Sequence, residues 1–163
     1  MVTVTPLEAE LMELAGAVPD PELPMISLAE LGVLRGLHLV APDRVQVELT
    51  PTYTGCPAIE AMASDIERVL HDRGIAEVEV RTVLSPPWST DAITAEGRRK
   101  LDEAGIAPPR DAGGGPVPVA LAIRCPHCGS TDTTLLSRFS STACKALRRC
   151  DSCREPFDHF KEL

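Results

Sequence analysis

Aromatic side chains are scarce in this sequence of 163 residues, which contains three Phe, one Tyr and one Trp. Any hydrophobic core must therefore be built mainly from Leu, Val, Ile and Ala. The hydrophobic content of 44% is normal for a globular protein and too high for a disordered one. The length suits one ordinary domain or two small ones.

The sequence also lacks the long apolar segments that membranes and secretion require. No stretch approaches the roughly 20 apolar residues of a membrane-spanning helix. The start, Met1 to Ala9, has neither the positive charge nor the apolar run of a secretory signal. We therefore expect a cytoplasmic protein with no membrane partner. In that setting its six cysteines are expected to bind metal rather than form disulfides.

Basic charge is in short supply, because 24 acidic residues face 16 basic ones and the net charge is −8. This balance argues against a nucleic-acid partner, since neutralising phosphates requires a basic face. The charge is uneven. From Arg124 onward seven basic and five acidic residues give +2, whereas the first 123 residues hold nine and nineteen and give −10. The slightly basic C-terminal segment could therefore contact an acidic surface, including that of its own N-terminal domain.

Apolar periodicity predicts a mixed set of elements before the Pro/Gly-rich stretch Ala107 to Val117. Leu7, Leu11 and Leu14 repeat with helical spacing, and prolines at 21 and 24 end that helix. The elements expected next are a β-hairpin around residues 37–49, a helix over 57–72 that ends at Gly74, a strand over 77–83 and a helix near 95–104.

Two CxxC pairs near the C-terminus carry the strongest chemical signal. Their spacing lets the thiolates of each pair turn back on one ion, and Gly129 suits the tight turn required. The pattern predicts a zinc ribbon, with two strands drawn from residues 133–139 and 143–149. Four thiolates leave no open position, so the expected role of the zinc is structural. The predicted ligands are Cys125, Cys128, Cys150 and Cys153.

The fold class predicted from these patterns is α+β. A small open α/β sandwich, with the order helix, hairpin, helix, strand, helix, precedes a β zinc ribbon. We expect the α/β domain to span 1–106, a Pro/Gly linker 107–120 and the zinc ribbon 121–163. The free sheet edges of so small a domain are compatible with a homodimer.

Three further side chains near the ribbon ligands allow two interpretations each. His127 and His159 lie close in sequence, but four cysteines already complete a tetrahedron, so we expect surface histidines. Cys144 is either a small buried hydrophobe, which is favoured, or a redox-active or auxiliary ligand.

Cys56 stands apart from the ribbon, between a predicted strand and a predicted helix. Pro57 suits the first position of that helix, so the Cys56 sulfur should lie where the helix dipole favours a thiolate. Gly55 would remove side-chain bulk beside it, so that a partner or metal could approach. A functional thiol and a merely buried one are equally compatible with these residues. A single thiolate suits transient ligation or covalent carriage better than turnover. Asp20 and Glu22 could line the same site, or form a solvated loop, and Trp88 is either a core residue or a contact residue.

Several motifs resemble known families. Asp20-Pro21-Glu22-Leu23-Pro24, Leu31-Gly32 and Thr50 to Pro57 resemble the metal–sulfur cluster assembly domains that include SufT. The runs Ser141 to Leu147 and Cys150 to Phe157 narrow the resemblance to the PaaD family, the D subunits of the multicomponent phenylacetyl-CoA epoxidase. The resemblance covers nearly the whole chain.

The resemblance implies a non-catalytic accessory factor in phenylacetate breakdown, which helps assemble an iron or iron–sulfur centre of the oxygenase or reductase subunits. Carried over to this sequence, Cys56 would be a transient iron or cluster ligand, and the two CxxC pairs would hold zinc. Cys144 lies in a family-like run without a defined role. One alternative is a structural subunit that docks through its ribbon. A zinc-ribbon nucleic-acid-binding protein is disfavoured by the charge.

Overall fold

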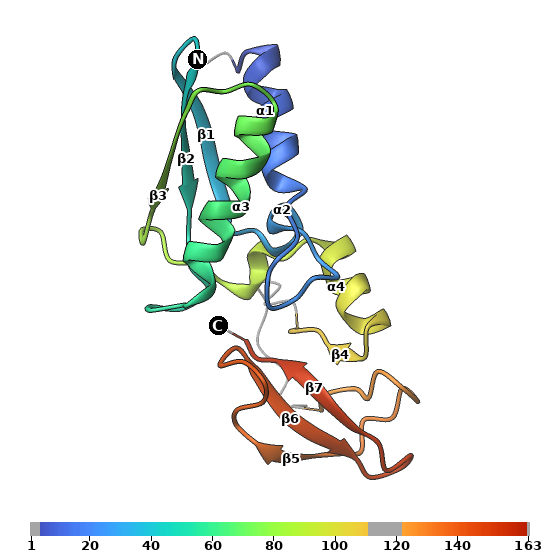
Figure 1. The fold of residues 1–163 in the computed structure, drawn as a ribbon. Helices are drawn as coiled ribbons and strands as arrows, with labels where there is room; N and C mark the ends of the chain where they lie inside the picture. Colours follow the sequence, from blue (N-terminus) through green and yellow to red (C-terminus); the bar gives the residue numbers. More distant parts are fainter. Residues whose placement is uncertain (1–3, 111–121, 163) are drawn as a thin grey trace. The chain divides into compact units, whose positions relative to one another are not determined.

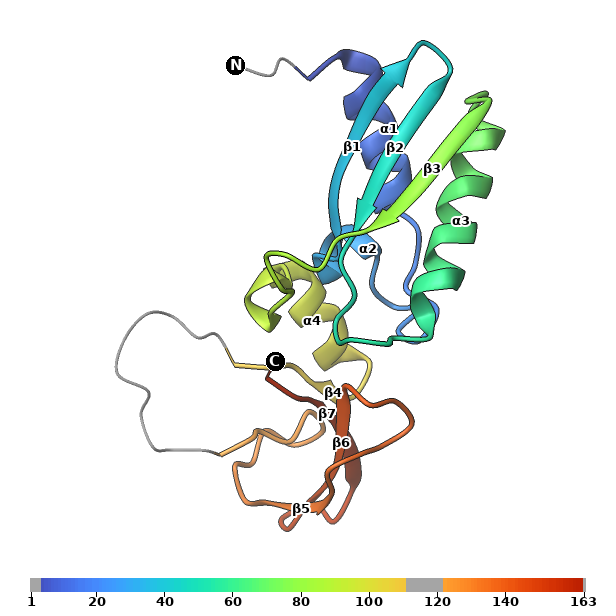
Figure 2. The same ribbon diagram turned by 90° about the vertical axis from the view of Figure 1, so that its left-hand side faces the viewer.

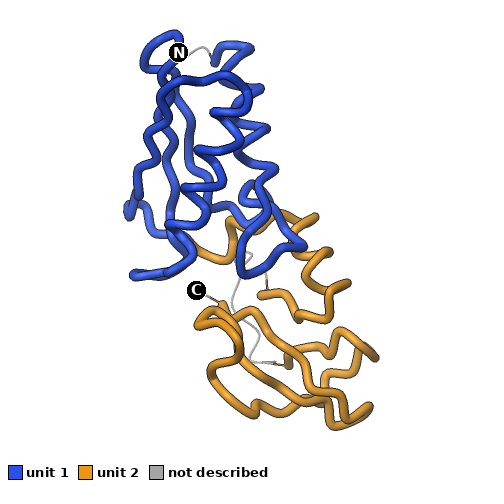
Figure 3. The backbone as a smooth tube through the Cα atoms, viewed as in Figure 1, with its two compact units in different colours: residues 1–88 blue, residues 89–163 orange. Residues whose placement is uncertain are grey.

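The computed structural model describes residues 4–110 and 122–162. Within these ranges the chain forms two compact units, residues 1–88 and 89–163, which Figure 3 shows in blue and orange. The mixed helices and strands confirm the predicted α+β class. Among the described residues, no helix combines the length and apolar character needed to cross a bilayer.

The first unit is a three-stranded sheet with two long helices on one of its faces, as Figures 1 and 2 show from two directions. Strands β1 and β2 form the predicted antiparallel hairpin, and β3 lies parallel to β2 at the other edge. The elements are α1 (Pro6–Gly16), α2 (Leu28–Leu31), β1 (Leu34–Ala41), β2 (Arg44–Leu49), α3 (Ala58–Asp72) and β3 (Glu77–Thr82).

Local sequence explains where these helices begin and which face they bury. The hydroxyl of Thr5 accepts a hydrogen bond from the Glu8 amide, and the Glu8 carboxylate accepts one from the Thr5 amide, so a capping box starts α1. In α3 the buried residues recur every four positions, which turns one stripe toward the sheet. These buried residues are Ala58, Met62, Ile66 and Leu70.

The second unit is a four-stranded sheet in the order β4-β7-β6-β5, preceded by a short helix. Strand β7 was not predicted from the sequence, and it occupies a central position between β4 and β6. The elements are η1 (Thr90–Ala92), α4 (Ala95–Glu103), β4 (Ile106–Ala107), β5 (Thr133–Ser137), β6 (Lys145–Cys150) and β7 (Pro156–Phe160).

The boundary between the units differs from the predicted one. We expected the first domain to end at residue 106, whereas the structure groups α4 and β4 with the ribbon. The reason is that Ile106 and Ala107 pair with β7, and Ala107 packs into the cluster that surrounds the cysteines. Of the predicted linker, residues 107–110 are described, and residues 111–120 lie outside the described part of the chain.

Candidate metal centre and the Cys56 loop

The four predicted ligands come together at one end of the ribbon, where all their sulfur atoms lie within 4.8 Å of one another. The Sγ atoms of Cys125 and Cys153 are 3.8 Å apart, and those of Cys128 and Cys150 are 3.5 Å apart. A disulfide would need about 2.05 Å. A tetrahedral zinc ion with bonds of about 2.3 Å to sulfur separates its ligands by about 3.8 Å. The donor set and its spacing therefore fit zinc.

Each CxxC pair lies on a tight turn of the same kind. The amide of Gly129 donates to the carbonyl of Cys125, and the amide of Arg154 donates to the carbonyl of Cys150. Gly129 and Arg154 both follow the first cysteine of their pair by four residues, and both have a left-handed backbone with φ of 77° and 69°. Glycine adopts this conformation readily, whereas arginine does so at a cost. The second turn therefore holds a strained residue that the sequence did not reveal.

The thiols of the second pair have strongly separated pKa values. The backbone amide of Cys153 donates to the sulfur of Cys150, and this hydrogen bond chiefly lowers the pKa of Cys150 to about 7. For Cys153 the Glu155 amide acts to lower the pKa, but burial and the neighbouring thiols outweigh it and raise the pKa to about 12. Four sulfur atoms so close together cannot all ionise alone, so a bound cation is needed to stabilise four thiolates.

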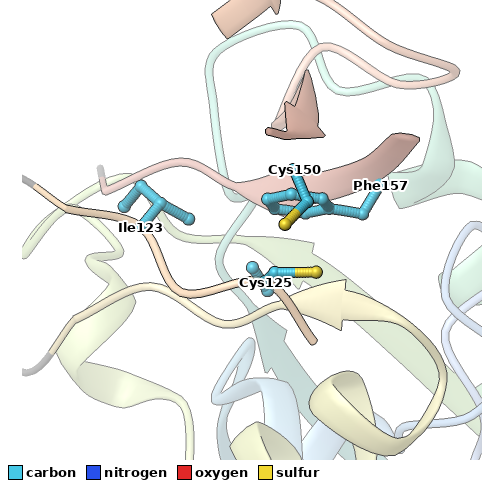
Figure 4. Packing of buried hydrophobic residues seen from close by; sticks show 5 residues of the cluster. Ile123, Cys125, Cys150 and Phe157 are labelled. Atoms are coloured by element: carbon cyan, nitrogen blue, oxygen red, sulfur yellow. The ribbon is translucent and has the colours of Figure 1, made fainter. Parts of the chain in front are cut away.

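The sulfur cluster is also part of the hydrophobic core of this unit. Cys125 and Cys150 are almost fully buried and pack with Ala107, Ile123 and Phe157. Figure 4 shows these two cysteines together with Ile123 and Phe157. The candidate metal site is therefore continuous with this part of the core.

Cys144 and the two histidines lie apart from the four-cysteine cluster. Cys144 is buried, with its sulfur 3.1 Å from the hydroxyl of Thr142. This position fits the interpretation of a small buried side chain. His127 is exposed, as expected. The expectation that His159 lies at the surface was wrong, because it is only 4% exposed: it alternates with Asp158 along β7 and shares a face with Phe157.

Cys56 lies in the loop that joins β2 to α3, and only 5% of its surface is exposed. Its amide donates to the carbonyl of Tyr53 at 3.2 Å, so the loop turns back on itself. Gly55 has φ of 80° and open space where a side chain would begin. Glycine is therefore required here by the backbone conformation. The open space beside it is compatible with the predicted approach of a partner or metal.

We expected the helix dipole to favour the thiolate form of Cys56, but the pKa of this thiol is raised. Burial raises the pKa of Cys56, and the Ala58 amide at the start of the helix offsets this only in part. The negative charge of Glu22 raises the pKa further, whereas the hydroxyls of Tyr53 and Thr52 act to lower it. At neutral pH the free side chain is therefore a thiol. A cation that binds it must displace a proton.

The proline turn at residues 20–24 contributes one of its two carboxylates to the Cys56 environment. Asp20 is buried, and its Oδ1 accepts hydrogen bonds from the amides of Glu22 and Leu23 at 2.8 and 2.7 Å. Asp20 thus holds the turn, while burial raises its pKa. Glu22 is the carboxylate whose charge acts on Cys56. The sequence proposed both residues for this site, and the structure separates their roles.

A small cavity of about 100 Å³ adjoins the same loop. Trp88 is buried and forms part of its wall. Its indole N–H donates to the carbonyl of Leu31 at 3.0 Å, so this side chain is part of the core. The sequence alone does not decide the role of Trp88, because its hydrogen-bond partner is distant in the chain. The residues that line the cavity are Thr50, Pro51, Thr52, Tyr53, Thr54, Leu84, Pro87 and Trp88.

Comparison with known proteins also divides the chain into two parts. Residues 8–84 match the family model described as iron–sulfur cluster assembly protein, and residues 112–161 match that of the PaaD zinc beta ribbon domain. The chain is 43% identical over 164 residues to a putative D subunit of 1,2-phenylacetyl-CoA epoxidase from Escherichia coli, covering 99% of this chain and 97% of that protein. The chain belongs to the PaaD family.

The N-terminal part of this PaaD-family chain has further relatives. It is 32% identical over 78 residues to the Fe-S protein maturation auxiliary factor SufT of Staphylococcus aureus, covering 47% of this chain and 88% of that protein. A crystal structure of a domain of unknown function, DUF59, from Bacillus anthracis superposes with a TM-score of 0.53 at 29% identity. That match covers 58% of this chain and 90% of the other.

Proposed function

We propose that this protein is a non-catalytic accessory factor of a phenylacetyl-CoA epoxidase system, in which it assists the assembly of an iron or iron–sulfur centre. The supporting observation is Cys56, a single buried thiol on the loop before α3, within the part of the chain that matches the iron–sulfur cluster assembly family. In this proposal the ribbon holds one structural zinc ion through its four cysteines.

The surroundings of Cys56 suit a transient ligand better than a permanent one. A thiol with a raised pKa binds cations reversibly, because each binding event competes with a proton. Glu22 is close enough for its charge to act on Cys56. Its carboxylate oxygen would be a second ligand of a kind that binds iron. Iron or a cluster would thus be cargo that passes to the oxygenase or reductase subunits.

The test is co-expression of Cys56→Ser with the oxygenase and reductase subunits, followed by measurement of iron, sulfide and epoxidase activity in those subunits. We expect the client centre to be underloaded, while the variant keeps one zinc per chain. Cys144→Ser is the matched control, since Cys144 is equally buried but lies outside both sites. Full iron content and activity with Cys56→Ser would refute the role of this thiol.

A second candidate function is a structural subunit that docks through its ribbon. It is favoured by three large apolar side chains with 45%, 50% and 64% exposure, which lie on or beside β5 at the open edge of the sheet. These residues are Leu135, Leu136 and Phe139.

Leu136→Glu combined with Phe139→Ser tests this docking function by co-purification with the epoxidase subunits. Loss of the complex with normal iron loading would support docking as the principal role. Val40→Ser is the control, because Val40 is similarly exposed but belongs to the first unit. Unchanged co-purification of the double variant would refute the β5 edge as a docking surface.

A further inference from the structure

Three segments of the first unit meet at the end of the sheet where the Cys56 loop begins. Strand β1 starts there and strands β2 and β3 end there, because β1 is antiparallel to β2 and β3 is parallel to it. The loop that carries Cys56, residues 50–57, follows β2, and residues 83–88 follow β3. These two segments provide the two walls of the cavity of about 100 Å³.

A β-bulge at Arg35 interrupts the pairing of β1 with β2. Leu34 lies opposite Leu49. Gly36 lies opposite Glu48, so Arg35 is an extra residue without a partner on β2. In an unbroken antiparallel register Arg35 would instead lie opposite the carboxylate of Glu48. Bulges of this kind redirect a side chain and are common beside functional sites. The bulge thus moves the guanidinium group away from the position opposite a carboxylate.

The guanidinium group of Arg35 joins the two walls of the cavity. Its Nε donates to the hydroxyl of Thr50 at 3.0 Å, and Thr50 lines the first wall. Its Nη2 donates to the carbonyl of Pro86 at 3.3 Å, and Pro86 directly precedes Pro87 of the second wall. Both acceptors are uncharged, and no carboxylate within residues 4–110 and 122–162 forms an ion pair with Arg35. Its charge is thus not used in a salt bridge there.

Thr50 is the anchored first residue of the Cys56 loop. Only 1% of its surface is exposed, and its amide donates to the carbonyl of Val33 at 2.8 Å. Its backbone and its hydroxyl therefore both hold the loop to the start of β1. Further along, the Cys56 amide bonds to the carbonyl of Tyr53, which is a contact within the loop itself.

The second wall has anchors of its own. The amide of Val83 donates to the carbonyl of Leu49 at 2.7 Å, and the indole of Trp88 donates to the carbonyl of Leu31. Residues 83–88 are therefore held at both ends. The bond to Arg35 lies between these anchors and gives the loop a fixed point of reference.

The first wall reaches the thiol. Thr52 and Tyr53 line the cavity, and their hydroxyl groups act on Cys56. A displacement of this wall would therefore change the surroundings of the sulfur atom.

We propose that Arg35 is a positioning residue for Cys56, which holds the loop of residues 50–57 against residues 83–88 and so keeps the thiol in one buried position. The inference rests on the proposed role of Cys56 as a transient ligand. A ligand that presents its sulfur reproducibly needs supporting side chains of fixed geometry. Arginine suits this role, because its planar fork points several N–H donors in fixed directions and a lysine ammonium does not.

The test measures alkylation of Cys56 by iodoacetamide in the zinc-loaded full chain, with Cys144→Ser as background and mass spectrometry to identify the modified residue. We expect Arg35→Met to increase the rate at least about tenfold, since two hydrogen bonds from a charged group are lost. The increase should not depend on low concentrations of urea, because the opening is local. An unchanged rate would overturn the proposal. So would an increase that grows with urea in step with global unfolding, because it would indicate only lower stability.

Three further variants sharpen the result. Arg35→Lys keeps the charge but not the fork, so it should alkylate as fast as Arg35→Met; an unsubstituted rate would contradict positioning by the fork. Thr50→Val removes one acceptor at nearly constant volume and should give a smaller increase, which keeps the test valid if Arg35→Met does not fold. Arg44→Met is the control, because Arg44 forms half-exposed ion pairs with Glu77 and Glu79 on the same sheet.

Co-expression with the oxygenase and reductase subunits provides the functional measurement. Arg35→Met should leave the client centre short of iron, as Cys56→Ser should, while zinc per chain stays the same. Full loading with Arg35→Met, where Cys56→Ser causes a loss, would overturn this inference alone. If Cys56→Ser itself leaves the iron content unchanged, the proposed function fails, and the alkylation rates still decide whether Arg35 positions the thiol.

Discussion

The two units of this chain are stabilised by different means. In the first unit, side chains such as Leu11, Leu49 and Ile66 are completely buried between the helices and the sheet. In the second unit, the cluster around Phe157 includes Cys125 and Cys150, two of the four candidate metal ligands. A ribbon of this size buries too little apolar surface to fold alone, so we expect a bound metal to take the place of a larger core. The same residue type, cysteine, is thus structural in the second unit and a candidate reactive group in the first.

Metal removal should give the largest contrast between the units. A strong chelator is expected to unfold the ribbon strands β5 to β7 and leave the first unit folded, because metal binding supplies roughly 10 kcal/mol or more to such sites. Amide spectra resolve the two units separately. Cys150→Ser should have the same effect, and Cys144→Ser should not. Loss of dispersion in both units, or in neither, would contradict this comparison.

A core truncation should produce the reverse pattern. Ile66→Ala removes a fully buried side chain from α3 and should cost about 3 kcal/mol of the unfolding free energy of the first unit. Zinc content per chain should stay the same. Denaturant unfolding measures the loss, and Leu136→Ala, on the exposed β5 strand, serves as a control with little expected effect. A change in zinc affinity with Ile66→Ala would show that the units are not independent.

Acid should weaken the second unit through His159. Its pKa is about 4 in the folded protein against an ordinary value of 6.5, so the neutral form is favoured on folding. The resulting stability is fully present above pH 6.5 and is lost as the pH falls toward 4. At pH 5 the loss should be roughly 2 kcal/mol.

His159→Leu should remove this part of the pH dependence. The measurement is the unfolding free energy of both proteins at pH 7 and pH 5, with zinc content checked at each pH to separate acid release of the metal. An identical decrease in the two proteins would exclude His159 as the source.

The smallest expected effect distinguishes the two metal-binding turns. Arg154→Gly should stabilise the second unit by about 1 kcal/mol, because glycine adopts the left-handed conformation at φ 69° without strain. Gly129→Ala should destabilise the first turn by at least a similar amount. Thermal unfolding of the zinc-loaded protein measures both. A destabilising Arg154→Gly would mean that this side chain makes a contact worth more than the strain.

Most elements of the first unit followed from local patterns, because α1, α3 and the hairpin each carry their own periodicity and turn signals. Strand β7 and the attachment of α4 to the ribbon did not. Apolar and polar side chains alternate only weakly over residues 156–160, and β4 has only two residues. Strand β7 and the position of α4 beside the ribbon therefore depend on pairing between segments that are distant in the chain. The surface position predicted for His159 was wrong for the same reason, since no pattern in the neighbouring residues indicates burial.

By itself, the sequence identified the four candidate metal ligands, because the C-x2-C spacing brings each pair of sulfurs onto one turn. It also determined the position of Cys56 at the start of a helix. The tertiary structure alone decided the protonation of that thiol, since burial and the charge of Glu22 outweigh the helix amide. Burial and charge depend on which distant segments surround a group, and no short sequence pattern encodes them.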